Sequence, residues 1–115
     1  MNCTISSIHY CPVKSVSFQN IELCEIKKNL GIVNDRIFAF SRNVDLEKAK
    51  LIEKDANERK LNYFLTLKNS PVLNKYNFFY ENNKLTLTLN NNNIISISAD
   101  DPSERLLLVN KLMEL

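Results

Sequence analysis

Hydrophobic and polar residues alternate along several short stretches of this chain. Residues 4–11 (TISSIHYC), 19–26 (QNIELCEI), 36–41 (RIFAFS) and 63–71 (YFLTLKNSP) place apolar side chains at every second position over much of their length. Such alternation, with β-branched and aromatic residues at the apolar positions, is typical of short β-strands. We therefore predict one strand in each of these four stretches, with turns between them.

A β-hairpin is predicted in the second half of the chain. Residues 76–82 (YNFFYEN) and 84–90 (KLTLTLN) meet at Asn82-Asn83. Asparagine tolerates the positive φ angles of a two-residue hairpin turn, so this dipeptide favours a tight reversal. Residues 93–99 (NIISISA) predict a further strand.

Two segments lack the alternation and favour helices. Residues 43–64 are rich in Glu, Lys, Ala and Leu, with Asp45 as a candidate N-cap, and predict either an exposed helix or a mobile insertion. Residues 100–115 predict a C-terminal helix in which Asp101 is the N-cap and Glu104 completes a capping box. An apolar stripe on this helix is expected to pack against the rest of the protein: Leu106, Val109, Leu112 and Met113.

Together these elements predict a mostly β fold, a small β-barrel of about six or seven short strands with a helical insertion and a C-terminal helix. A chain of 115 residues, 44% of them hydrophobic, suits one domain spanning residues 1–115. Its last residue, Leu115, is still apolar. We therefore expect this domain to be a fragment, with a second domain downstream.

Net charge and hydropathy narrow the classes of partner. The net charge is +2 and no stretch forms a basic arm, so we expect no nucleic-acid partner. No stretch approaches the ~20 apolar residues of a membrane-spanning helix, and the N-terminus lacks the pattern of a signal peptide. We expect a cytoplasmic protein without a membrane partner.

The chain contains three cysteines and one histidine, which do not have the spacing of a disulfide framework or a zinc site. We interpret Cys3, Cys11 and Cys24 as reduced thiols. His9, on the same strand face as Ser7, is interpreted as a hydrogen-bonded strand residue. The alternative is that Cys11 is a reactive thiol whose pKa a nearby lysine lowers.

Two polar dipeptides are candidates for chemistry. Lys14-Ser15 follows Pro12 and offers an ammonium group, a hydroxyl and backbone N–H groups to an anion. Arg36, preceded by Asp35, heads a predicted strand and suits bidentate contact with a phosphate or carboxylate. Each has an ordinary alternative, which is an exposed turn for the first dipeptide and a local surface ion pair for the second.

Thr66 and Lys68 form a third candidate pair. They alternate onto one face of the strand predicted for residues 63–71. There they add a hydroxyl and a cation to an anion site, or they are the solvent face of an edge strand.

The order of these motifs resembles a known family. The segments YCPVKS (residues 10–15), LGIVNDRIFAF (residues 30–40) and FLTLKNSPVL (residues 64–73) follow one another along most of residues 4–90. This order is similar to that of the N-terminal β-barrel domain that precedes the MOSC domain. That domain pair occurs in relatives of molybdenum cofactor sulfurases and of the mitochondrial amidoxime reducing component.

The resemblance implies a cofactor and a set of contacts. Lys14, Ser15 and Arg36, with Lys68, match positions that help hold the pterin and phosphate of the molybdenum cofactor. In the family, molybdenum is bound by a cysteine of the following MOSC domain, so neither a catalytic residue nor a metal ligand is expected in this chain. The implied partners are a MOSC domain in the same chain and a redox partner protein.

The sequence departs from the family pattern in three places. Cys11 separates Tyr10 from Pro12. Lys68 stands where the family usually has arginine, and lysine lacks the planar fork that binds anions bidentately. Residues 43–63 are longer than the family's usual hairpin.

The expected function is therefore the N-terminal domain of a molybdenum cofactor-dependent oxidoreductase or sulfur-transfer protein, which is not catalytic alone. The alternative is a stand-alone, non-catalytic β-barrel interaction module. A thiol enzyme that uses Cys11 is a third interpretation.

Overall fold

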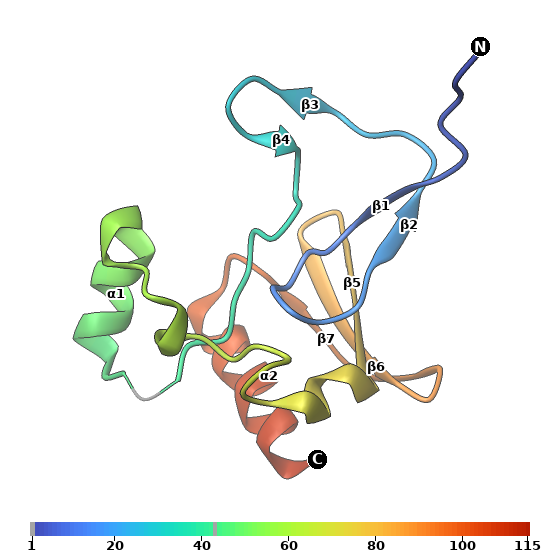
Figure 1. Cartoon of the computed structure of the whole chain (residues 1–115). Coiled ribbons are helices and arrows are strands. Elements are labelled where there is room, and N and C mark those ends of the chain that lie inside the picture. The colour runs from blue at the N-terminus through green and yellow to red at the C-terminus, as the bar shows by residue number, and fades with distance from the viewer. Residues whose placement is uncertain (1, 43) are drawn as a thin grey trace.

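The computed structural model describes residues 2–42 and 44–115. Within them the chain forms seven strands, two α-helices and three short 3₁₀ helices (Figure 1). The strands are β1 (Ile8–Tyr10), β2 (Gln19–Ile21), β3 (Ile26–Lys27), β4 (Gly31–Ile32), β5 (Tyr76–Glu81), β6 (Lys84–Leu89) and β7 (Asn92–Ser98). The α-helices are α1 (Leu46–Lys54) and α2 (Pro102–Glu114), and the 3₁₀ helices span Ala56–Glu58, Leu61–Tyr63 and Pro71–Lys75.

The antiparallel sheet β5-β6-β7 is the centre of the fold. Its two reversals are Asn-Asn turns: Asn82 and Asn83 have φ angles of 50° and 62°, and Asn90 and Asn91 have φ angles of 52° and 65°. After glycine, asparagine is among the residues that adopt positive φ most readily. The hairpin predicted at Asn82-Asn83 is confirmed, and these turns help to fix the register of the sheet.

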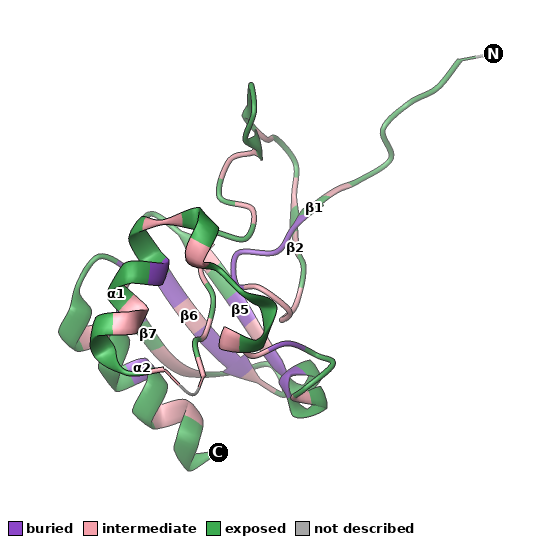
Figure 2. Cartoon of the chain, turned by 60° about the vertical axis from the view of Figure 1, so that its left-hand side comes forward, coloured by how far each residue is buried: buried purple, intermediate pink, exposed green. Residues whose placement is uncertain are grey.

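One hydrophobic core lies between this sheet and α2. Phe78 of β5 and Leu87 of β6 are register partners, and both are buried because alternate residues of a strand share a face. Leu108 of α2 belongs to the same cluster, whose other buried members are Val13, Tyr76, Leu85 and Ile97. Figure 2 shows the buried residues gathered on the central sheet and on the segment that follows β1.

Side chains from the N-terminal half satisfy the outer edge of β5. The backbone N–H of Phe78 donates to Ser17 Oγ at 3.0 Å. The backbone N–H of Tyr80 donates to Gln19 Oε1, also at 3.0 Å, and the Tyr80 carbonyl accepts from the Tyr10 hydroxyl at 2.9 Å. These bonds occupy backbone groups of an edge strand that could otherwise pair with another chain. They also attach the β1-β2 pair to the central sheet.

The hairpin β3-β4 is a separate two-stranded sheet that projects away from the rest of the domain (Figure 1). Gly31 starts β4 with a φ angle of 88°, which only glycine adopts without strain.

The charged segment after residue 43 contains a capped helix. The Asp45 carboxylate accepts from the backbone N–H of Lys48 at 2.7 Å, which confirms the predicted N-cap of α1. Ile52 is the buried residue of this helix. The segment was predicted to be either an exposed helix or a mobile insertion, and the structure contains the helix. Asn43, at the start of the predicted segment, lies outside the described residues.

The C-terminal helix and its cap at Asp101 are confirmed, because the Asp101 carboxylate accepts from the backbone N–H of Ser103 at 2.9 Å. The predicted capping box is wrong. Glu104 instead accepts from the backbone N–H of Ser98 at 2.6 Å, and so ties the first turn of α2 to the end of β7.

The predicted apolar stripe of this helix is also wrong in part. Leu108 is buried and Leu112 is half-buried against the core. Leu106 and Met113 leave 60% and 81% of their surface exposed. Leu108 lines a cavity together with Ile97 and Ala99, whereas Leu106 is not part of that lining.

The structure confirms a β-rich domain of seven short strands with a helical insertion and a C-terminal helix. The barrel is matched only loosely, because the strands belong to three separate antiparallel sheets. In place of the single strand predicted at residues 19–26, the structure has two strands, β2 and β3, separated by residues 22–25.

Two other predicted strands are reduced to single bridges. Val13 pairs with Phe38, and Ser41 pairs with Phe64. In residues 63–71, the Asn69 side chain accepts from the backbone N–H of Thr66 at 2.9 Å. That contact closes a turn, so the strand predicted there cannot continue.

Candidate functional site

The two motifs that contain Lys14 and Arg36 lie side by side. Residues 11–14 run parallel to residues 36–38. Three backbone hydrogen bonds join them: Arg36 N–H to the Cys11 carbonyl (2.6 Å), Phe38 N–H to the Pro12 carbonyl (3.0 Å) and Lys14 N–H to the Phe38 carbonyl (2.8 Å). Pro12 fits this ladder because it contributes only its carbonyl.

Asp35 joins the two motifs through its side chain. Its Oδ1 accepts from the backbone N–H of Cys11 at 2.9 Å, and its Oδ2 accepts from Arg36 Nη1 at 2.7 Å. The local ion pair considered from the sequence is therefore present. The Arg36 side chain is 61% exposed, so this pair contributes little to stability.

Ser15 and Arg36 share an uncommon backbone conformation. Their φ angles are 64° and 52°, whereas the other described residues with positive φ are Gly31 and six asparagines. For residues other than glycine and asparagine this conformation costs about 1–2 kcal/mol, and such positions concentrate at functional sites. Ser15 is the third residue of a turn closed by the Val16 N–H and the Val13 carbonyl at 3.2 Å.

Lys14 and Arg36 line one cavity of about 610 Å³, with α1 on its other side. Two more arginines line the same cavity, Arg59 from the segment after α1 and Arg105 from α2. Glu53 of α1 is the carboxylate in this lining. Four cationic side chains against one carboxylate make the cavity suited to an anion.

Arg59 and Arg105 are held in place by backbone carbonyls. Arg59 donates from Nε to Ile52 and from Nη2 to Glu53, each at 2.9 Å, and so caps the C-terminus of α1. Arg105 donates from Nε to the Ala99 carbonyl. A guanidinium has five N–H donors, so both arginines keep donors for an anion while their positions are fixed.

Lys14 contributes a cation without a local partner. Its side chain is half-buried, and its ammonium group has no hydrogen-bond or ion-pair partner within residues 2–42 and 44–115. Glu53 approaches Arg105 only to 3.9 Å, and 72% of its side chain is exposed. An anion entering the cavity would therefore compete with this weak pair and with the closer pair between Arg36 and Asp35.

Ser15 and Lys68 are not brought into this cavity. Ser15 follows Lys14 in the turn but does not line the cavity. Lys68 is exposed in the turn that Asn69 closes, and it is likewise absent from the lining. The four residues taken from the resemblance thus divide into two that share a cavity, Lys14 and Arg36, and two that do not.

The candidate thiol and histidine each make a local hydrogen bond. Cys11 is buried, with its Sγ at 2.8 Å from the Val13 carbonyl, and buried thiols of this kind are inert. Cys3 and Cys24 are free thiols. His9 Nε2 lies 3.1 Å from Ser7 Oγ, which confirms a hydrogen-bonded strand histidine.

The cavity fits one part of the cofactor that the resemblance implies. Its charge suits a phosphate dianion, since arginine binds phosphate through paired N–H donors and lysine binds it as a point charge. In the described part of the chain, no group of three or more His, Cys, Asp or Glu side chains could hold a metal ion. The cationic side chains of the lining are compatible with a phosphate group.

Sequence reasoning missed Arg59 and Arg105. Arg59 lies in the charged segment of residues 43–64, for which the sequence predicted an exposed helix or a mobile insertion and no site. For Arg105 the sequence contained one indication. A cation near the N-terminus of a helix interacts unfavourably with the helix dipole, so its presence there suggests another interaction. Neither pattern shows that the two arginines meet Lys14, because that depends on how α1 and α2 pack.

No family model matches the chain, and no curated protein or solved structure matches it. None of the helices in residues 2–42 and 44–115 has the length and hydrophobicity to span a bilayer.

Proposed function

We propose that this domain binds the phosphate of the molybdenum cofactor pterin as the N-terminal half of a cofactor-dependent oxidoreductase or sulfur-transfer protein. Its natural setting in this proposal is the cytoplasm, next to a MOSC domain that binds the metal. The single observation that carries the proposal is that Lys14 and Arg36, from separate motifs, line one cavity with Arg59 and Arg105.

The proposed roles follow from how each cation is held. Arg36 offers the guanidinium donors that Asp35 leaves unused, so it suits bidentate contact with two phosphate oxygens. Lys14 adds a point charge. Arg59 and Arg105, which are fixed by backbone carbonyls, orient the anion between α1 and α2.

The bound cofactor would supply oxygen-atom or sulfur transfer at molybdenum. This chain's own contribution is to hold the anionic end of the pterin. Charge-assisted hydrogen bonds of this kind contribute about 1.5–3 kcal/mol each when desolvated. They contribute less in a cavity that faces water, so the domain alone should bind weakly.

Cofactor retention tests the proposal. The protein is expressed from its complete reading frame in a host that makes the cofactor, and the retained pterin is oxidised and quantified by fluorescence. Lys14→Ala combined with Arg36→Ala should lower the retained pterin by about tenfold or more. The matched control is Lys27→Ala with Lys28→Ala, which removes two positive charges from the exposed hairpin. Equal pterin in both double variants would contradict the proposal.

A second candidate function is a non-catalytic interaction module, favoured by the apolar surface of the projecting hairpin. Ile26 and Leu30 in the hairpin, and Leu23 just before it, are exposed by 73%, 64% and 89%. Large apolar side chains gathered on one projection are typical of a protein contact. Two results together would favour this function. Wild-type protein would carry no pterin, and the double variant Ile26→Ser with Leu30→Ser would lose a protein partner that wild-type protein binds.

A further inference from the structure

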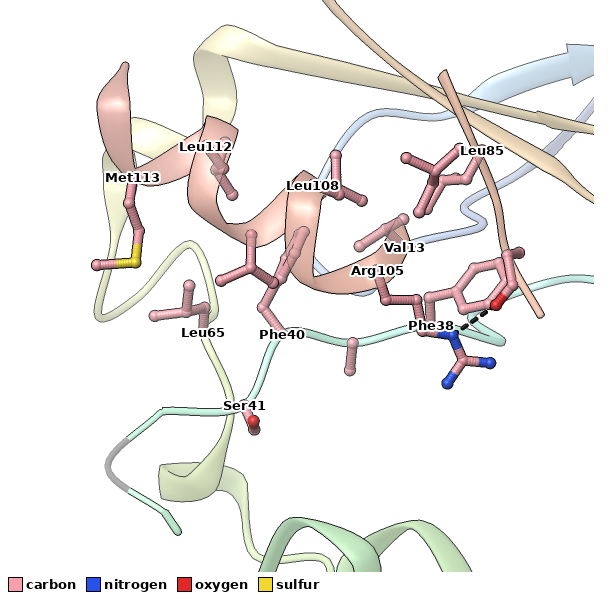
Figure 3. Close-up of a pocket in the computed structure, with 14 residues that line it drawn as sticks. Val13, Phe38, Phe40, Ser41, Leu65, Leu85, Arg105, Leu108, Leu112 and Met113 are labelled. Atoms are coloured by element: carbon pink, nitrogen blue, oxygen red, sulfur yellow. Dashed lines mark hydrogen bonds between the residues drawn. The ribbon is translucent and has the colours of Figure 1, made fainter. Parts of the chain in front are cut away.

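A second cavity, of about 360 Å³, lies between α2 and the segment of residues 38–41 (Figure 3). This volume is within the range of small-molecule sites. Its lining is almost entirely hydrocarbon and includes Val13, Phe40, Leu65, Leu85, Ile97 and Leu108. The irregular backbone of residues 38–41 and the small side chain of Ala99 leave this space beside the core.

The cavity is partly open to solvent and has both buried and exposed lining residues. Its floor residues Val13, Ile97 and Leu108 are exposed by only 1%, 3% and 3%. Its rim includes Val109 and Met113, which are exposed by 37% and 81%. The apolar lining thus runs from the core to exposed side chains at the rim, which suits a ligand whose apolar chain lies against it.

The two ends of the cavity differ in charge. Figure 3 shows Arg105 at one end and Met113 at the other. Arg105 is the single charged side chain among the described residues of this lining, and Ser41 is the hydroxyl. Arg105 keeps guanidinium donors beyond the Nε that bonds to the Ala99 carbonyl. The cavity therefore complements a molecule with an apolar tail and an anionic head.

We propose that this cavity binds a single-chain amphiphilic carboxylate, such as a medium-chain fatty acid. The hydrocarbon tail lies along α2 toward Met113, and the carboxylate is bound by Arg105 near the wall shared with the cationic cavity. The inference goes beyond the proposed pterin function and does not depend on it. The two sites use different residues apart from Arg105 and the shared segment around Phe38.

Titration calorimetry with dodecanoate and with dodecanol, both below their aggregation concentrations, tests the head and the tail together. Wild-type protein should bind one dodecanoate, with dodecanol about tenfold weaker, because a charge-assisted hydrogen bond contributes that much to affinity. Arg105→Met should make the two affinities equal. Equal affinities in wild-type protein, or no binding of dodecanoate, would overturn the inference.

A matched pair of variants tests the location. Val109→Trp places a bulky ring at the rim and should lower dodecanoate affinity by about tenfold or more. Leu107→Trp puts the same ring on an exposed position of α2 outside the lining and should leave the affinity unchanged. Equal loss in both variants would contradict the assignment, provided that circular dichroism shows both to be folded.

Methyl NMR of wild-type protein keeps the test independent of any variant. Dodecanoate should shift the methyl signals of Ile97, Leu108 and Leu112, and leave those of the hairpin residues Ile26 and Leu30 unchanged. Shifts confined to the hairpin would overturn the inference. Binding of an amphipathic helical peptide, but not of dodecanoate, would instead assign the cavity to a protein partner, and that result would also overturn the inference. The Val109→Trp variant also separates this inference from the proposed function. It should still retain pterin, because Val109 does not line the cavity that contains Lys14 and Arg36.

Discussion

The Asp35 carboxylate accepts a hydrogen bond from the backbone N–H of Cys11 at 2.9 Å. This contact connects two motifs that are 24 residues apart and fixes the register in which Lys14 and Arg36 reach the same cavity. Asp35 is thus a positioning residue for the candidate site, acting through the backbone.

Replacing Asp35 should therefore destabilise the domain. Asp35→Ala leaves the N–H of the buried Cys11 without an acceptor, which costs about 1–3 kcal/mol in the free energy of unfolding. Asp35→Asn keeps an acceptor oxygen and should lose less. Urea denaturation of the three proteins measures the difference. An Asp35→Ala variant as stable as wild type would show that this contact does not hold the motifs together.

The positive φ angle of Ser15 gives a second prediction. Ser15→Gly should leave stability within about 1 kcal/mol of wild type, since relief of strain offsets the greater flexibility of the unfolded chain. Ser15→Val should lose more than about 1 kcal/mol, because a β-branched residue is an outlier in this conformation. Thermal unfolding followed by circular dichroism measures both. If valine is tolerated as well as glycine, the turn at Ser15 is not as described.

Tyr10 predicts a loss of stability at high pH. Burial, with smaller effects from Glu81 and Tyr80, raises the pKa of the Tyr10 phenol above 10.0. Its hydrogen bond to the Tyr80 carbonyl is then fully present below pH 10 and is lost as pH rises through the folded-state pKa. Tyr10→Phe should cost about 0.5–1.5 kcal/mol at pH 7. The free energy of unfolding of Tyr10→Phe should decrease less at high pH than that of wild type. Urea denaturation of both proteins at pH 7 and above pH 10 would show this.

The Asp101 cap leads us to predict a loss of folding stability at low pH. Hydrogen bonds from the hydroxyl and backbone N–H of Ser103 hold the pKa of the Asp101 carboxyl below 3.8. A lowered folded-state pKa means that the cap stabilises the protein above pH 3.8 and ceases to do so as pH falls through the folded-state value. Asp101→Asn, which caps without titrating, should show a smaller acid-induced loss than wild type. Urea denaturation at neutral and acid pH measures this loss. An equal decrease in the free energy of unfolding of both proteins at acid pH would contradict the prediction.

The sequence predicted those elements that local chemistry determines. The Asn82-Asn83 hairpin, the cap of α1 at Asp45 and the helix beginning after Asp101 depend on residues within a few positions of one another. Alternation failed in residues 63–71, because the Asn69 side chain competes with strand hydrogen bonds for the backbone of Thr66.

The candidate site was predictable in part, for a similar reason. Lys14 and Arg36 belong to short motifs whose order along the chain suggested a shared anion. Arg59 and Arg105 reach the cavity only through the packing of α1 and α2, which no local pattern specifies. Lys68 was expected in the site because alternation suggested a strand, and it lies elsewhere because that strand ends in a turn.

The central claim is that Lys14 and Arg36 form one anion site, and titration with inorganic phosphate, followed by amide NMR, tests it most directly. Shifts should concentrate in residues 11–14 and 35–38, persist in Lys68→Ala, and disappear in Lys14→Ala with Arg36→Ala. Phosphate-induced shifts that are absent, or that survive unchanged in the double variant, would contradict the account.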